Sequence, residues 1–600
     1  MTTTPPRWDL TNIYPSLGSK EFKAAFDELK KKIADLGDYF DEVVVKATAK
    51  TPPKELGQIL GEVVDRFNDT YVLSTTLGPY VSFHVDTNSH DKVAKRLESE
   101  YEQAAVPLRK LGVRFQAWLG KIAPALEQAL PNHPSAQAHA FNLKEAAELS
   151  KYLMSEDLEG LAAELTLSGG NAWGKLMGTV TSQLTVDFEL DGKTETLPMP
   201  ALINLRSHPD GEVRRRAYEA ENAAWDSVRE TLAACLNGVK GEVNTLNKRR
   251  GREDALHSAL DQARIDRPTL EAMMEAMKDS FPLFRKYFKH KAKLLGKEKL
   301  AWYDLYAPVG KTGGNISYEE ARDFILEHFT NFSPELTAFA KRAFDHNWLD
   351  AEQREGKRAG GYCSGVEAVK ESRIFVNFDG SADQISTIAH ELGHAFHNEC
   401  AYQANKTVIQ QDTPMTLAET ASTFCETIVT EARLARTKDP QEELAILEGH
   451  LNGASQVIVD IYSRFLFEKE IFERRDQAEL SADEFCEIME RAQKATYGDG
   501  LDERYLQKYM WTWKPHYYST GISFYNFPYA FGLLFGTGLY AIFKQRGAAF
   551  VQDYKNLLAS TGEATAADLA DRFGIDIRKK KFWADSIAII AKHVDRYCEL

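Results

Sequence analysis

The chain has 600 residues and a formal net charge of −15, and 43% of its residues are hydrophobic and 27% are charged. These values are typical of globular proteins and exclude a chain that is largely disordered, collagen-like or built of many membrane spans. The acidic balance argues against nucleic acid as the main partner, because phosphate contacts need clustered lysine and arginine. One hydrophobic core rarely supports this length, so we expect roughly two to four folding units.

The six cysteines form no CxxC pair and are too sparse for a disulfide scaffold. Residues 1–30 lack the apolar segment of a secretory signal. We therefore expect a protein of the reducing cytoplasm. The sequence leaves open whether it is a monomer or a small homo-oligomer.

Helical periodicity dominates the first part of the chain, where apolar residues recur three or four positions apart, as in residues 22–33. The alternating residues 184–190 are followed by Asp191-Gly192, a pair typical of two-residue hairpin turns. The sequence therefore predicts a β-hairpin at this point. Prolines follow it, so we expect a domain boundary near residue 200.

Beyond that boundary, helical patterns continue and strand signals are few. Gly356, Gly360, Gly361 and Gly365 predict a flexible loop, and a short strand, Ile374–Phe378, follows it. The predicted fold class is mainly α with a small β element.

The segment from Tyr517 to Phe543 carries no charged side chain, as a membrane span would. Serine, threonine, asparagine, proline and several glycines and tyrosines interrupt it, which makes it a poor bilayer helix. We expect a buried helix within a large α-helical body instead, and no membrane partner.

The clearest chemical signal lies in a predicted helix after Ser381, a good N-cap residue. His394 is four positions after His390, so both imidazoles project from one helix face and can bind a single Zn²⁺. The helix pitch turns Glu391 away from His390 by about 100°. Glu391 can therefore act as a general base toward a water without being a metal ligand.

The motif alone does not identify the third metal ligand. His397 lies about 10 Å along the helix axis from His390, too far to share one ion, so we expect it beside the site. A second helical pattern begins after Pro414, and a helix folding back across the first could present Glu419 to the metal. Glu426 shares that face and could hold a ligand histidine. Both glutamates could equally be solvated helix acids.

This run resembles the oligoendopeptidase F family of zinc metallopeptidases, relatives of thimet oligopeptidase and neurolysin. In that family one helix carries His-Glu-x-Gly-His-x-x-His, as residues 390–397 do here. A glutamate 25 residues after the second histidine completes the zinc site, and this position is Glu419. The resemblance covers most of the chain, from Trp8–Pro15 to Lys514–Tyr518 and Phe524–Gly532. It implies one Zn²⁺ per chain, held by two histidines and this glutamate.

The resemblance also implies active-site residues in a histidine- and tyrosine-rich segment near the C-terminus. In relatives, such side chains stabilise the tetrahedral oxyanion and bind substrate, and a donor near developing charge is what this chemistry needs. We assign this role to His516 and to one tyrosine: Tyr525 first, then Tyr518, then Tyr529. Any one of these tyrosines could instead be core packing.

The same resemblance implies that Ile374–Phe378 and the segment with Gly361 and Tyr362 line a cleft, where an extended peptide adds as a strand. The implied fold is a large helical body split by a deep channel. Residues 1–200 would be a helical lid or channel wall that ends in the hairpin. Residues 201–600 would be the catalytic part.

The expected function is that of a cytoplasmic zinc endopeptidase that hydrolyses internal bonds of short oligopeptides. A zinc carboxypeptidase or dipeptidase remains an alternative, since the same helical motif also serves exopeptidases. A non-catalytic peptide-binding protein of the same fold is a second alternative. Glu391 argues against it, because a pure binder has no use for a general base.

Overall fold

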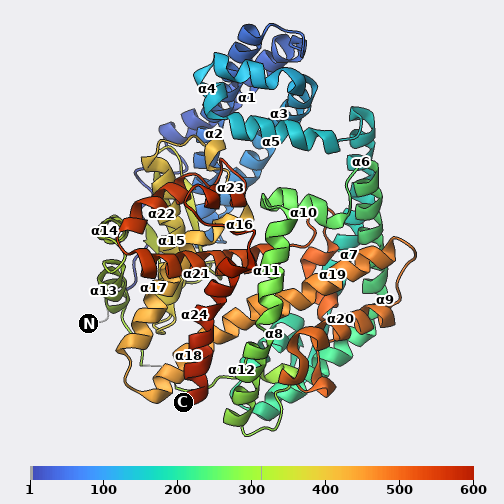
Figure 1. Ribbon diagram of the computed structural model, residues 1–600, viewed down its shortest axis with the longest axis vertical. Coiled ribbons are helices and arrows are strands. Elements are labelled where there is room, and N and C mark those ends of the chain that lie inside the picture. The colour runs from blue at the N-terminus through green and yellow to red at the C-terminus, as the bar shows by residue number, and fades with distance from the viewer. Residues whose placement is uncertain (1–3, 312–313) are drawn as a thin grey trace. The chain divides into compact units, whose positions relative to one another are not determined.

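The computed structural model describes residues 4–311 and 314–600, and it confirms a mainly α fold with small β elements (Figure 1). The chain forms two compact units, and each unit is assembled from three separate chain segments. The first unit comprises Met1–Leu153, Gly313–Ala432 and Ile542–Ile575. The second comprises Met154–Thr312, Arg433–Ala541 and Asp576–Leu600.

Helices make up most of the first unit. They are α1 (Lys20–Glu42), α2 (Pro53–Thr87), α3 (Lys92–Ala129), α4 (Pro134–Ala138), α5 (Ala140–Leu149), α13 (Tyr318–Phe329), α14 (Pro334–Asp345), α15 (Gln384–Gln403), α16 (Met415–Ala418), α22 (Ala549–Ala559) and α23 (Ala566–Asp571). A further helix, α17 (Thr420–Arg436), begins in this unit and continues into the second.

The N-terminal helices form their own hydrophobic core. Ser19 caps α1 by accepting a hydrogen bond from the Phe22 backbone N–H at 3.1 Å. Apolar residues at helical spacing on α1 are buried against α2 and α3, and Trp118 on α3 lies deep in this core. α15 packs beside α22, although the two helices are far apart in sequence.

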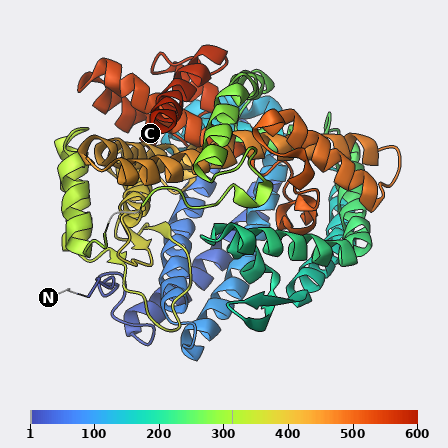
Figure 2. The same cartoon turned by 90° about the horizontal axis from the view of Figure 1, so that it is seen from below.

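A three-stranded sheet in the first unit has the order β3-β5-β4, with β3 (Leu349–Asp350), β4 (Tyr362–Val366) and β5 (Glu371–Phe375). β4 pairs antiparallel with β5, whereas β3 pairs parallel with it. β4 is therefore an edge strand, and it lies beside α2 (Figure 2). This edge leaves backbone groups for pairing with another extended chain.

The structure corrects two details of the predicted loop and strand. The strand expected at Ile374–Phe378 is β5, which both begins and ends three residues earlier, at Glu371 and Phe375. The earlier start includes the buried Arg373, which is tolerated inside the strand because it is paired. The guanidinium of Arg373 donates to the Asp9 carbonyl and to Asn12. Gly365, expected in the loop, lies within β4, where a Cβ would come 2.7 Å from the hydroxyl oxygen of Tyr402.

The second unit is also mainly helical. Its helices are α6 (Glu156–Ser168), α7 (Gly170–Gln183), α8 (Met199–Asn204), α9 (Gly211–Arg249), α10 (Ala255–Ala263), α11 (Arg267–Asp279), α12 (Phe281–Leu294), α18 (Pro440–Ser455), α19 (Ile461–Arg475), α20 (Ala482–Tyr497) and α24 (Lys580–Glu599). Another helix, α21 (Phe527–Arg546), belongs mostly to this unit.

The predicted hairpin is present as β1 (Thr185–Leu190) and β2 (Lys193–Pro198). Asp191 and Gly192 have φ of 52° and 74°, the left-handed conformation that a two-residue turn of this kind requires. The hairpin belongs to the second unit, whose first segment starts at Met154 and whose α7 packs on α9. These units differ from the division expected at residue 200, and the roles of lid and channel wall stay predictions.

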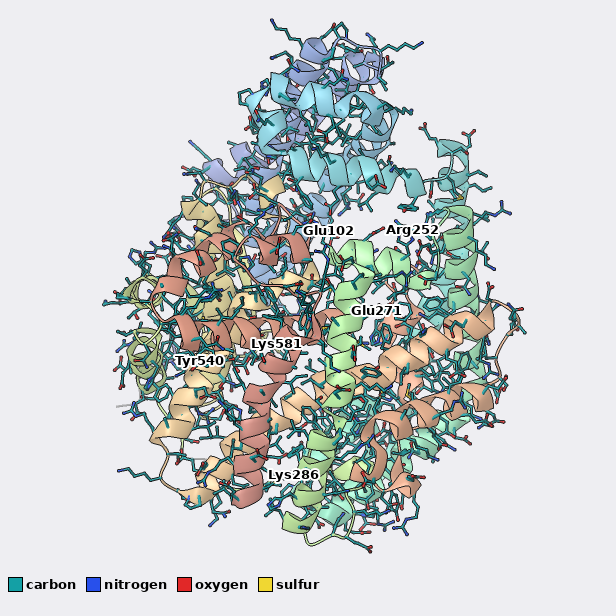
Figure 3. The ribbon with its side chains drawn as sticks, in the orientation of Figure 1. Glu102, Arg252, Glu271, Lys286, Tyr540 and Lys581 are labelled. Atoms are coloured by element: carbon teal, nitrogen blue, oxygen red, sulfur yellow. The ribbon has the colours of Figure 1, made fainter. Side chains whose placement is uncertain are left out.

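The uncharged segment near the C-terminus forms a largely buried helix from Phe527 onward, as expected, whereas its first ten residues, 517–526, are not α-helical. It contributes α21, and Tyr540 on this helix, labelled in Figure 3, is 7% exposed. Among the described residues, none of the helices combines the length and apolar character needed to cross a membrane.

Candidate metal centre and catalytic site

Three side chains of the first unit converge as the sequence predicts for a metal centre. His390 and His394 lie one turn apart on α15, and the Nε2 atom of each is 3.3 Å from Oε2 of Glu419. All three candidate ligand atoms lie within 4.8 Å of one another. A tetrahedral ion with bonds near 2.0 Å separates its ligands by about 3.3 Å. The distances between the carboxylate and the two imidazoles therefore fit zinc.

A close approach of two helices brings Glu419 to the histidines. Glu419 lies at the junction of α16 and α17. Gly393, between the two histidines, packs against the first turn of α17, where a Cβ would lie 2.4 Å from the Ala421 carbonyl oxygen. The glycine thus lets the α17 backbone pass directly over α15. Ser422 then fixes the carboxylate by donating a hydrogen bond to Glu419 Oε2 at 2.7 Å.

Two carboxylates orient the imidazole of His390 and raise its pKa. Its Nδ1 lies 3.2 Å from Oε2 of Glu426, so Nδ1–H can donate to Glu426 while Nε2 faces Glu419. Burial alone would lower the pKa of His390, but hydrogen bonds to Glu419 and Glu426 raise it to about 10. Although partial burial opposes it, hydrogen bonds from the same imidazoles hold the pKa of Glu419 far below its usual range. This arrangement orients the imidazole and makes Nε2 a stronger donor to a metal.

Glu391 is buried next to this centre, and part of its hydrogen-bonding capacity is unused. Its Oε2 atom is buried and has no hydrogen-bond partner among the described residues. Burial raises the pKa of Glu391 despite the nearby imidazoles. A buried carboxylate oxygen without a donor is costly unless a ligand or water supplies one. Glu391 therefore has the position and the basicity of a proton acceptor.

The metal centre opens into a cavity of about 660 Å³ within the first unit. Gly361 and the edge strand β4, which begins at Tyr362, line one side of it. A Cβ at Gly361 would lie 3.4 Å from Glu391 Oε1, so this glycine places the backbone of the segment next to the carboxylate. The Tyr362 hydroxyl donates to Asp86 at 2.8 Å, which anchors this strand to α2.

His397 is buried away from the ligand atoms, as its place on the helix predicts. Its Nε2 lies 2.9 Å from the hydroxyl of Thr561, which follows α22 in the sequence. Burial lowers the pKa of His397 to about 4, so the ring is neutral. Thr561 also contacts the hydroxyl of Thr413, which precedes α16. His397 thus helps to hold the segment that leads to Glu419.

The histidine and tyrosines of the C-terminal segment belong to the second unit. His516, Tyr525 and Tyr529 line one cavity of about 430 Å³. The rings of His516 and Tyr525 are 5.5 Å apart, and the two tyrosine hydroxyls are 2.6 Å apart. Burial and nearby positive charges lower the pKa of His516 to about 3. The imidazole is neutral, and Asn526 donates to its Nε2 at 2.9 Å, which leaves Nδ1–H as the ring's donor.

Tyr518 differs from the other two tyrosines. It is 4% exposed, and its hydroxyl donates to the Trp511 carbonyl at 3.2 Å. Its hydroxyl is therefore already used inside the protein, and Tyr518 does not line the cavity that contains His516.

Sequence reasoning missed two residues that orient site groups. Ser422 fixes the Glu419 carboxylate, and Asn526 fixes the tautomer of His516. The available signal was spacing: Ser422 follows Glu419 by three residues, which places both on one side of a helical turn. Asn526 is adjacent to Tyr525, but no periodicity marks it as a partner of the histidine.

Known proteins resemble this chain, two of the following three over 95% or more of its length and the third over 65%. Oligopeptidase PepF of Bacillus subtilis is 23% identical over 592 residues, which cover 95% of this chain and 83% of that protein. The chromosomal oligoendopeptidase F of Lactococcus lactis is 26% identical over 394 residues, and the match spans 64% of that relative's length. A second Lactococcus lactis protein, an oligoendopeptidase F homolog, is 24% identical and is covered over 94% of its length.

Solved structures share the fold. A candidate peptidase from Chlamydophila abortus superposes with a TM-score of 0.86 at 19% identity, and the match covers 100% of both chains. Oligoendopeptidase F from Enterococcus faecium gives 0.68 at 18% identity, over 97% of this chain and 98% of that one. The sequence profile of Peptidase family M3 matches residues 204–589, which include the metal centre and the His516 segment. The chain therefore belongs to Peptidase family M3.

Proposed function

We propose that this protein is a zinc-dependent oligoendopeptidase that hydrolyses internal bonds of short peptides. Membership of a peptidase family implies peptide substrates and a metal. Relatives named oligoendopeptidase F and oligopeptidase PepF support the size class of the substrate. The observation that carries the proposal is the triad of His390, His394 and Glu419 with a basic carboxylate, Glu391, beside it.

In this proposal His390, His394 and Glu419 hold one zinc ion, and Glu426 orients His390. When bound, zinc acts as a Lewis acid toward the scissile carbonyl and the attacking water. Glu391 accepts the proton of that water through its free Oε2 and then delivers the proton to the leaving amine. The raised pKa of Glu391 suits both steps, because the group must bind the proton and release it.

The proposed oxyanion donors are His516 and one tyrosine. The neutral His516 offers Nδ1–H, and Tyr525 offers its hydroxyl; Tyr529 contacts Tyr525 and could relay or bind substrate. Donors held in place before the reaction stabilise the developing negative charge without reorganisation. Tyr518 is the least suited of the three tyrosines, because its hydroxyl is engaged in the interior.

Edge strand β4 is the proposed peptide-binding element. It has one neighbour, β5, in its sheet, and Gly361–Gly365 line the cavity at the metal centre. An extended peptide adding to this edge would bond main chain to main chain. Such pairing ignores most side chains, which suits an enzyme that accepts varied short peptides.

Two measurements test the proposal together. Zinc content is determined on the purified protein, and the products from peptides of increasing length, blocked at both ends, are identified by mass spectrometry. An endopeptidase cuts blocked peptides, whereas a carboxypeptidase or dipeptidase does not. Glu391→Gln should keep stoichiometric zinc and lose cleavage by at least about 10²-fold. A peptide-binding protein without catalysis would cleave none of the series.

Glu399→Gln is a matched control for this variant. Glu399 lies on the same helix, is also buried and accepts from Arg342 at 2.6 Å, away from the ligand atoms. It should retain zinc and turnover. Retained turnover in Glu391→Gln would overturn the assignment of the base.

We also propose a cytoplasmic location. The six cysteines all carry free thiols, and reduced cysteines suit a reducing compartment.

A further inference from the structure

The cavity beside His516 in the second unit contains a cation that the proposed reaction does not use. A π-helical turn, Gln456–Asp460, and the start of α19 form one wall, and the segment Trp513–His516 forms another. The side chain of Lys514 lines this cavity of about 430 Å³. A positive charge in such a place needs an explanation, because charged groups leave water only at a cost.

Lys514 has no counter-ion within the described parts of the chain. Its Nζ makes no hydrogen bond or ion pair there, and it lies 3.8 Å from the centroid of the Trp513 ring. The aromatic ring compensates the cation for part of the hydration that it loses, but it does not neutralise the positive charge. Arg464, which shares the cavity, is paired with Asp460, so its charge is balanced. Of the lysine and the arginine that line this cavity, Lys514 is therefore the one without an ion-pair partner among the described residues.

Other groups around the cavity are donors that lack acceptors. Each of three side chains has a buried nitrogen without a hydrogen-bond partner in the described structure: Gln456 Nε2, Arg464 Nε and Trp513 Nε1. Burial and the neighbouring charge of Arg464 also lower the pKa of Lys514 to about 7, although the carboxylates of Asp460 and Glu221 act in the opposite direction. Donors without acceptors and a cation without an anion are complementary to a single kind of ligand. That ligand accepts hydrogen bonds and carries negative charge.

We propose that this cavity binds a carboxylate of the peptide substrate, with Lys514 as its ion-pair partner. The inference rests on the proposed function, since it takes the ligand to be the peptide that His516 and Tyr525 serve. Every unblocked peptide has a carboxylate at its C-terminus, and acidic side chains carry the same group. A carboxylate accepts hydrogen bonds at both oxygens, so it can pair with Lys514 and still take a further donor.

A carboxylate site gives the enzyme a means to select peptides by charge. Lys514 would then determine specificity and would not take part in bond cleavage. Its removal should raise KM with little change in kcat, as expected when binding to ground state and transition state is lost equally.

The test compares N-acetylated peptides that differ in a single charge. One pair has the same sequence and ends in a carboxylate or a carboxamide. A second pair, both carboxamides, has Glu or Gln in the last positions. With wild-type protein, we expect one of the two carboxylate forms to have a KM about 10- to 100-fold below that of its neutral partner. The pair that shows the difference identifies the source of the carboxylate.

Variants assign the effect to Lys514. Lys514→Met should bring the KM ratio close to one, and Lys514→Arg should keep most of it. Lys469→Met is the matched control: Lys469 is an exposed residue of α19, with a side chain 57% exposed, and its loss should leave the ratio unchanged. A ratio near one for both pairs in the wild type would overturn the proposal. So would a ratio that persists in Lys514→Met.

Failure of the proposed function would look different. If the wild-type protein with zinc cleaves no peptide, the peptidase proposal fails and the same peptides are titrated calorimetrically. A dissociation constant at least about tenfold lower for a carboxylate form, lost in Lys514→Met, would still support the site. Equal dissociation constants for charged and neutral peptides would reject it.

Discussion

The contact of Gly393 with α17 predicts that one added methyl group will disable the metal centre. In Gly393→Ala, the new Cβ would lie 2.4 Å from the Ala421 carbonyl oxygen and 2.6 Å from the Ser422 Cα. Favourable contacts between such atoms begin near 3.5 Å, so the two helices must separate locally by about 1 Å. Both clashing atoms belong to backbone, which cannot rotate away as a side chain would.

The magnitude follows from this displacement. Overpacking of a tight helix contact costs about 1–3 kcal/mol of folding stability. Moving Glu419 by about 1 Å also disturbs a ligand geometry in which both imidazole nitrogens lie 3.3 Å from its Oε2. Misplacement on this scale lowers turnover by about 10²-fold. We expect weaker zinc binding, a kcat/KM reduced to about a hundredth, and a lower midpoint of urea unfolding.

The assay combines chelator competition for zinc, cleavage of an internally quenched peptide and urea denaturation. Gly449→Ala is the control, because Gly449 on α18 has a normal helical φ and no atom within 4 Å of the place that a new methyl group would take. Alanine in an open helix position is neutral or stabilising by up to about 1 kcal/mol. If Gly393→Ala binds zinc and cleaves peptide like the wild type, the close helix contact does not position Glu419.

Three further predictions concern the same centre and its partners. Glu426→Gln should weaken zinc affinity by about 10- to 100-fold, measured by chelator competition, because His390 loses the charged acceptor at its Nδ1. Zinc affinity should fall about tenfold per unit as the pH drops from 8 to 6, because His390, with a pKa raised to about 10, must lose a proton to bind metal; a flat profile in buffered zinc would contradict this. Tyr525→Phe should lower kcat by about 10²-fold or more with little effect on zinc content, whereas Tyr518→Phe should mainly lower stability, as judged by thermal unfolding.

Helix periodicity explains which parts of the site were predictable from sequence. His390, Glu391 and His394 lie within one helix, so their relative directions follow from its pitch. Glu419 was predictable only through the family spacing, because residues 404–414 separate the two helices and their path depends on distant partners. Asn68, on α2, accepts a hydrogen bond from the Ile409 backbone within that segment, and no local pattern reveals such a contact.

For the β elements too, features set by the local sequence were predictable, and features set by contacts with distant residues were not. The hairpin turn at Asp191-Gly192 was predictable, because two left-handed residues favour this dipeptide. The start of β5 was not, since the polar Arg373 is buried there through contacts with the N-terminal segment. Lys514 was visible in the sequence only as a neighbour of His516. Its lack of a counter-ion is a property of the folded cavity.

The first unit is assembled from three segments of chain, and this has a consequence for biosynthesis. His397 on the metal-binding helix bonds Thr561, which lies 164 residues further along the chain. All three proposed metal-binding residues are therefore synthesised well before Ile542–Ile575, the last segment of the unit that contains them. Contacts between residues so distant in sequence form late in folding. We expect nascent chains to remain inactive until Ile542–Ile575 has been synthesised and has packed against the metal-binding helix.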